Sequence, residues 1–144
     1  MIQKIFIDTD ILLDIALARE PFISASSRVV RLIETKRAFG YISSSTITNL
    51  YYIFRKIAGD IEAREFLRKT LSFISLISIT QADVSKSLES SFSDFEDALQ
   101  HFCALRNKCD CIITKNVNDY KHSEIKVYTP IDFLSTYKKL YSES

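Results

Sequence analysis

Five short apolar runs, separated by longer segments, constrain the fold of this sequence more than any other feature. The runs cover residues 4–8, 40–43, 74–79, 111–114 and 125–128. Their β-branched composition is typical of buried strands, and the connections between them are too long for tight hairpins. Such strands pair in parallel and are covered by helices on both faces. The sequence therefore predicts an α/β fold, a three-layer α/β/α sandwich with a central parallel sheet of about five strands.

The segments between these runs carry helical periodicity and capping signals. Apolar residues recur at helical spacing over 10–19, 24–37, 46–58, 60–71, a segment from 80, 93–107 and a segment from 129. Ser93 and Glu96 form an S-x-x-E capping box that predicts the start of the helix at 93–107. We also expect Asp10 to cap the helix that begins at Ile11, and Asp14, one turn later, to be exposed.

Length and composition set the broad class of protein. The 144 residues are expected to form a single domain over 1–144, and the net charge of +1 argues neither for nor against nucleic acid binding. No apolar run approaches the roughly 20 residues of a membrane span, and no signal peptide is evident at the start. The three cysteines are expected to be reduced thiols. These features favour a cytoplasmic protein that does not enter a membrane.

Acidic residues gather where three of the predicted elements should meet. In parallel sheets, ligands bind beyond the carboxyl ends of the strands. Asp8 ends the first strand, Thr114 ends the fourth, and the helix that carries Asp94 and Asp97 begins at the same edge. Carboxylates that converge without basic partners repel one another, so one must stay protonated unless a cation binds. Oxygen ligands of this kind suit Mg²⁺ or Mn²⁺.

The residue types restrict the chemistry further. The only histidines are His101 and His122, which offer no plausible Ser-His-Asp set, and two glycines cannot build a glycine-rich phosphate loop. A divalent cation held by carboxylates can stabilise charge on a phosphoryl group. The sequence therefore favours metal-dependent hydrolysis of phosphodiesters.

Several stretches, in their order along the chain, resemble the PIN domain family and in particular its VapC-like toxin ribonucleases. The stretches are IFIDTDILLDI at 5–15, SSSTITNLYYIFRK at 43–56, DFEDALQ at 94–100, IITKNVNDY at 112–120 and YTPIDFL at 128–134. The resemblance implies a usually dimeric ribonuclease that binds Mg²⁺ or Mn²⁺ and cleaves single-stranded RNA. It also implies the toxin half of a type II toxin–antitoxin pair, with an antitoxin protein as partner.

The resemblance also assigns roles to individual residues. Asp8 and Asp97 match the family's principal acids and should bind the metal, aided by Asp94 and Asn116. Asp119 would be a further catalytic acid near the rim of the pocket, where it could orient the attacking water.

Three further positions are candidates for contact with the RNA, namely Asn49, Thr114 and Lys115. Asn49 departs from the family pattern, because most such enzymes have a glutamate there. Asparagine can ligate a metal through its carbonyl oxygen but brings no charge, so the metal should bind more weakly. Asp94 could compensate by adding an acid on the face of Asp97.

Two alternatives remain open at this point. A catalytically weak or inactive PIN domain that binds RNA or protein would also explain Asn49, and its affinity for RNA should survive EDTA. A haloacid-dehalogenase-type phosphatase would use the D-x-D formed by Asp8 and Asp10, with Asp8 as nucleophile. Its expected downstream lysine and acidic pair are in the wrong order here, and the chain is short for that class.

Overall fold

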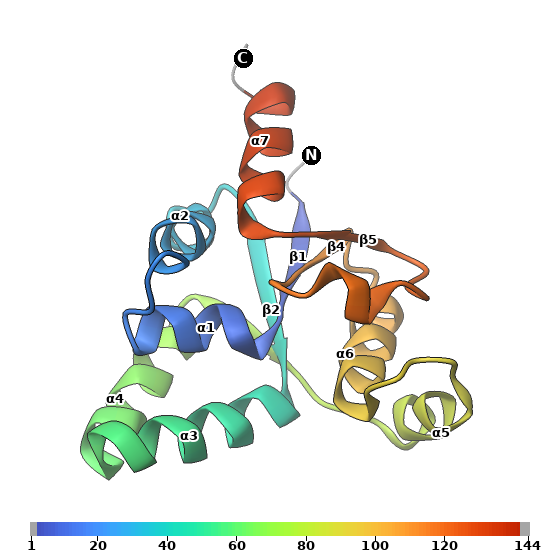
Figure 1. Ribbon diagram of the computed structural model, residues 1–144, viewed down its shortest axis with the longest axis horizontal. Coiled ribbons are helices and arrows are strands. Elements are labelled where there is room, and N and C mark those ends of the chain that lie inside the picture. The colour runs from blue at the N-terminus through green and yellow to red at the C-terminus, as the bar shows by residue number, and fades with distance from the viewer. Residues whose placement is uncertain (1–2, 142–144) are drawn as a thin grey trace.

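In the computed structural model, which describes residues 3–141, the strands form one five-stranded parallel sheet (Figure 1). The strands are β1 (Lys4–Ile7), β2 (Phe39–Ser43), β3 (Ile74–Ile77), β4 (Cys111–Ile113) and β5 (Lys126–Tyr128). Their order in the sheet is β3-β2-β1-β4-β5, with β1 at the centre. The chain moves outward from β1 first on one side and then on the other, so the switch point of the topology lies between β1 and β4.

Seven α-helices and one short 3-10 helix surround the sheet in the described residues. They are α1 (Thr9–Ala16), α2 (Ile23–Glu34), α3 (Ser44–Ala58), α4 (Asp60–Leu71), α5 (Gln81–Glu89), α6 (Phe95–Arg106), η1 (Val117–Tyr120) and α7 (Pro130–Tyr141). In Figure 1, α1 to α4 and α7 lie on one side of the sheet, and α5 and α6 lie on the other. The predicted α/β/α sandwich with five parallel strands is therefore confirmed.

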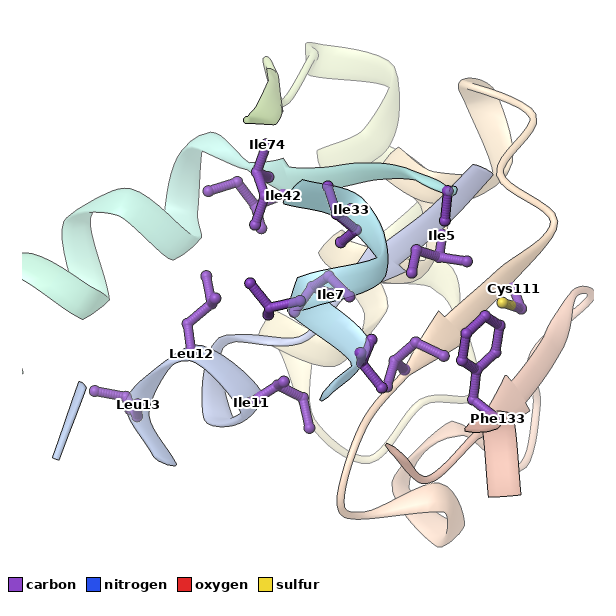
Figure 2. Close-up of a cluster of buried hydrophobic side chains, with 14 of the residues drawn as sticks. Ile5, Ile7, Ile11, Leu12, Leu13, Ile33, Ile42, Ile74, Cys111 and Phe133 are labelled. Carbon is purple, nitrogen blue, oxygen red and sulfur yellow. The ribbon is translucent and has the colours of Figure 1, made fainter. Parts of the chain in front are cut away.

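The larger of two hydrophobic cores lies between the sheet and the helices α1, α2, α3 and α7 (Figure 2). Ile5 and Ile7 of β1 point into it and are fully buried, as alternation along a strand requires. Gly40 of β2 packs against Ile33 of α2 so closely that a Cβ atom there would collide with the isoleucine side chain. This contact explains the glycine within a strand.

The second core fills the opposite face of the sheet. Phe6, which alternates with Ile5 and Ile7, packs there with Ile112 of β4 and with Cys103 of α6. Tyr120 of η1 is buried in the same cluster. The two cores hold β1 and α6 in fixed positions relative to each other, which matters because both elements carry site residues.

Several local expectations are corrected by the structure. Asp94, not Ser93, is the N-cap of α6, because the Asp94 side chain accepts a hydrogen bond from the Asp97 backbone N–H. Helix α1 begins at Thr9, so Asp10 lies in its first turn and does not cap it. Asp14 is fully buried, because it faces Lys115 and Arg19.

No helix within residues 3–141 combines the length and the apolar character needed to cross a membrane.

Candidate active site

A pocket of about 410 Å³ lies at the carboxyl edge of the sheet, beside the switch point between β1 and β4. Six carboxylates line it, together with Thr9, Leu13, Asn49, Ile53 and Asn116. The six are Asp8, Asp10, Asp94, Glu96, Asp97 and Asp119. They come from β1–α1, from the start of α6 and from the segment after β4, so the fold assembles the pocket from residues far apart in sequence.

Asp8 lies at the bottom of this pocket, held by the pairing of β1 with β4. Ile7 pairs with Ile113, so the next residues, Asp8 and Thr114, also lie side by side. The Thr114 hydroxyl donates to Oδ2 of Asp8 at 2.7 Å. Gln100 Nε2 donates to Oδ1 at 3.1 Å. Asp8 is only 6% exposed, and its pKa is raised by burial and by the charge of Asp10, although the two hydrogen bonds lower it.

A chain of buried polar side chains fixes the orientation of Gln100. The Thr9 hydroxyl donates to Oγ1 of Thr46 at 3.1 Å, and the Thr46 hydroxyl lies 3.5 Å from Oε1 of Gln100. These three residues come from α1, α3 and α6 and are all buried. The amide of Gln100 therefore presents its N–H to Asp8, which keeps the carboxylate in place.

The surroundings of Asp97 strongly raise the pKa of its carboxyl group. Its pKa rises to about 7, first because the carboxylate is partly buried, then because Asp8, Asp94 and Asp119 repel its charged form. Tyr120 favours the charged form of Asp97 but does not offset these effects. The Tyr120 hydroxyl is buried next to Asp97 and has no hydrogen-bond partner of good geometry in the described residues.

Glu96 extends the acidic wall toward α3. Its Oε2 accepts a hydrogen bond from Nδ2 of Asn49 at 2.7 Å. Burial raises the pKa of Glu96, and the charges of Asp8, Asp94 and Asp10 raise it further, although the hydrogen bond from Asn49 lowers it. Glu96 therefore lies within the same electrostatic cluster and is not the capping partner of Ser93.

The segment after β4 closes the other side of the pocket. The Asn116 backbone N–H donates to the Thr114 hydroxyl at 3.2 Å, and Nδ2 of Asn116 donates to Asp10 at 3.3 Å. Asp119 is exposed at the rim, within η1. Asn116 and Asp119 both line the pocket, as their positions after the fourth strand predict.

Thr114 and Lys115 occupy different positions from those expected of RNA-contacting residues. Thr114 is buried beneath Asp8 and does not line the pocket. The Lys115 ammonium group lies 3.1 Å from Oδ1 of buried Asp14 and 4.2 Å from the centre of the Phe22 ring. Arg19 lies 3.7 Å from the same Asp14 oxygen. The structure thus gives Lys115 a buried ion pair that sequence reasoning did not anticipate.

The donor set of the pocket fits a hard divalent cation in its chemistry. No Lys, Arg or His is among the described residues that line it, so six carboxylates face one another without a basic partner. No three His, Cys, Asp or Glu residues in the described chain are already close enough together to hold a metal ion. A cation could be held here only if these carboxylates turned toward it, which would also relieve their mutual repulsion.

Sequence reasoning missed two polar residues of this site and misassigned two acids. Gln100 lies on the same face of α6 as Asp97, three residues later, which is a usable signal once the face is known. Tyr120 ends a 3-10 helix that has no clear sequence pattern. The sequence predicts a capping role for Asp10 and Glu96, because Asp10 directly precedes the helix expected from Ile11 and Glu96 lies three residues after Ser93. A capping role explains these positions as well as a place in the pocket does.

The fold and the pocket define an α/β protein with an acidic binding site at the switch point of a parallel sheet. The sequence model of the PIN domain matches residues 4–118. Because this match covers most of the chain, the chain belongs to the PIN domain family. The family assignment removes the support for a haloacid-dehalogenase-type phosphatase.

Individual relatives agree with this assignment. The chain is 26% identical over 143 residues to the protein named Ribonuclease VapC1 from Aquifex aeolicus (strain VF5), an alignment that covers 96% of this chain and 98% of the relative. A toxin–antitoxin complex from Klebsiella pneumoniae contains a similar chain, with a TM-score of 0.66 and 23% identity over 87% of this chain and 96% of that one. VapBC2 from Rickettsia felis, solved bound to a DNA fragment from its promoter, has a TM-score of 0.65 and 16% identity over 88% and 97%. The two structures show that the fold is shared.

Proposed function

We propose that this protein is a ribonuclease that hydrolyses phosphodiester bonds of single-stranded RNA with Mg²⁺ or Mn²⁺ as cofactor. The observation that carries the proposal is the uncompensated acidic pocket at the switch point, in which the pKa of Asp97 rises to about 7. The protein most similar in sequence among those compared above carries the name Ribonuclease VapC1, which supports the same activity.

Asp8, Asp94, Asp97 and Asn116 would hold the cation. When bound, the cation supplies positive charge that stabilises the phosphodiester as negative charge builds up on its oxygens. Asp8 is fixed by Thr114 and Gln100 and so serves as the rigid ligand, whereas Asp97 is less buried and can turn toward the cation. The site thereby combines one preorganised oxygen ligand with several adjustable ones.

Asp119 is suited to act on the water that attacks. It is exposed at the rim, where its carboxylate can accept a proton as the water oxygen bonds to phosphorus. The bond from phosphorus to the leaving ribose oxygen then breaks, and that oxygen takes up a proton from solvent. The products are one phosphate monoester and one free hydroxyl group.

A toxin role with an antitoxin partner is part of this proposal. It is supported by the fold shared with chains of toxin–antitoxin complexes. Tyr52, Ile57 and Ile61 of the α3–α4 hairpin are 54%, 66% and 76% exposed, which offers apolar surface for a homodimer or an antitoxin.

We also expect a single domain over 1–144 in the cytoplasm. The free, buried thiols of all three cysteines agree with a reducing compartment.

A second candidate function is an RNA-binding or protein-binding PIN domain without catalysis. The uncharged Asn49 within the pocket is the observation that favours it. Cleavage of a mixed single-stranded RNA pool, with Mg²⁺, with Mn²⁺ and with EDTA, separates the two functions. A nuclease loses activity in EDTA, whereas a binding module leaves the RNA intact and keeps its affinity for RNA.

A further inference from the structure

Glu96 turns away from its own helix and toward α3. An acid in the first turn of a helix commonly interacts with the free N–H groups of that turn. In α6 the Asp94 side chain already accepts from the Asp97 N–H, at 3.0 Å. Glu96 instead reaches across the pocket, where Oε2 accepts from Nδ2 of Asn49 at 2.7 Å. Both residues line the pocket beside Asp8 and Asp97.

The hydrogen bond from Asn49 fixes one oxygen of the Glu96 carboxylate but supplies no positive charge to neutralise it. A lysine or arginine at position 49 would cancel the negative charge, but the amide of Asn49 donates one hydrogen bond and remains uncharged. Within residues 3–141, the other oxygen of Glu96, Oε1, accepts no hydrogen bond. The residue therefore has no basic partner and keeps one oxygen free at the pocket, which is what a cation ligand requires.

A buried hydroxyl group lies beside the acidic cluster. Tyr120 is 2% exposed, and its hydroxyl lies next to Asp97 without a hydrogen bond of good geometry within residues 3–141. A poorly paired buried hydroxyl is costly, so a small movement of the Asp97 carboxylate that completes this hydrogen bond would be favourable.

We propose that Glu96 is a carboxylate ligand of the divalent cation on the α3 side of the pocket, and that Asn49 is the positioning residue that holds it there. The inference deepens the proposed function and rests on it. In this arrangement the α3 side of the pocket still has a carboxylate although residue 49 is an asparagine, because Glu96 of α6 supplies that carboxylate.

The test is a calorimetric titration of purified full-length protein with Mn²⁺. Glu96→Gln should weaken Mn²⁺ binding about 10- to 100-fold, and Asn49→Ala about 10-fold, because a ligand or its support is lost. Glu89→Gln removes the same charge from an exposed site at the end of α5 and should leave the affinity unchanged. Thermal unfolding of each variant verifies that it is folded.

Exchange of the amide of Asn49 and the carboxylate of Glu96 tests whether Mn²⁺ binding depends on the negative charge of the pair or only on its packing. The double variant Asn49→Asp/Glu96→Gln keeps the hydrogen bond with donor and acceptor reversed and moves the charge to α3. It should bind Mn²⁺ at least about tenfold more tightly than Glu96→Gln alone. The rescue, taken together with the loss of affinity in Glu96→Gln, would show that the charge of the pair and not only its packing supports Mn²⁺ binding.

The outcomes distinguish the inference from the proposed function. Wild-type affinity in Glu96→Gln, or a double variant no better than Glu96→Gln, overturns the inference while metal-dependent RNA cleavage by the wild type stands. A wild-type protein that neither binds Mn²⁺ nor cleaves RNA overturns both.

Discussion

The Thr114 hydroxyl donates a 2.7 Å hydrogen bond to Oδ2 of Asp8, although the two residues are 106 positions apart in the sequence. The pairing of β1 with β4 places them side by side at the end of the sheet. Asp8 is thereby kept at a fixed angle within the pocket. The buried support beneath the pocket should consequently matter for activity as much as the acids that line it.

Replacement of Thr114 tests this support directly. Thr114→Val keeps the shape of the side chain but removes the donor, so the free energy of unfolding should fall by about 2 kcal/mol. RNA cleavage should fall about tenfold, because Asp8 is then less well oriented. Thr114→Ser retains the hydroxyl and should restore most of the activity. If Val and Ser reduce cleavage equally, the hydrogen bond does not position Asp8.

The raised pKa of Asp97 predicts a dependence of stability on pH in protein freed of metal by EDTA. The pKa of Asp97 is about 7 in the folded protein against an ordinary value of 3.8. Between these two values the unfolded chain loses the proton while the folded protein retains it, so stability declines as pH rises from about 4 to about 7. Above about 7 both states are ionised and the loss stays constant.

Comparison with Asp97→Asn isolates this effect from other groups. Burial lowers the pKa of His101, so that residue destabilises the fold as pH falls, and the total dependence on pH is mixed. Asparagine cannot ionise, so the melting temperature of Asp97→Asn should exceed that of the wild type at pH 8, with the difference closing by pH 4. An equal difference at both pH values would contradict the raised pKa.

Lys115 should act on stability rather than on RNA. In Lys115→Met, the fully buried Asp14 keeps only Arg19, at 3.7 Å, and the free energy of unfolding should fall by about 2 kcal/mol. Lys121→Met removes an exposed lysine from the nearby loop and should leave stability unchanged. RNA affinity of folded Lys115→Met, measured by fluorescence anisotropy at two salt concentrations, should match that of the wild type. A weaker affinity with a lower salt dependence would restore the RNA-contact role predicted from the sequence.

The sheet and the general location of the site could be predicted from the sequence, because they follow from periodicity and from the handed, parallel nature of βαβ connections. All five strands lie where the apolar runs predict them, within one or two residues. Asp8, Asp97, Asn116 and Asp119 meet in one pocket because they follow strands or begin a helix at the same edge of the sheet.

The side-chain partners could not be predicted, because they depend on contacts between distant elements. Nothing local distinguishes an exposed Asp14 from one buried against Lys115, or a capping Glu96 from one bound to Asn49. Local spacing favoured an exposed Asp14 and a Glu96 that caps its own helix. In the tertiary structure both residues bind a partner from another element.

The central claim is that the acidic pocket hydrolyses RNA with a divalent cation. The most direct measurement is cleavage of a single-stranded RNA pool by the wild type and by Asp8→Asn, prepared identically, with Mn²⁺ and with EDTA. We expect cleavage by the wild type in Mn²⁺ that disappears in EDTA and falls about 100-fold in Asp8→Asn, because the rigid carboxylate at the bottom of the pocket loses its charge. Cleavage that persists in EDTA, or that Asp8→Asn retains in full, would contradict the account.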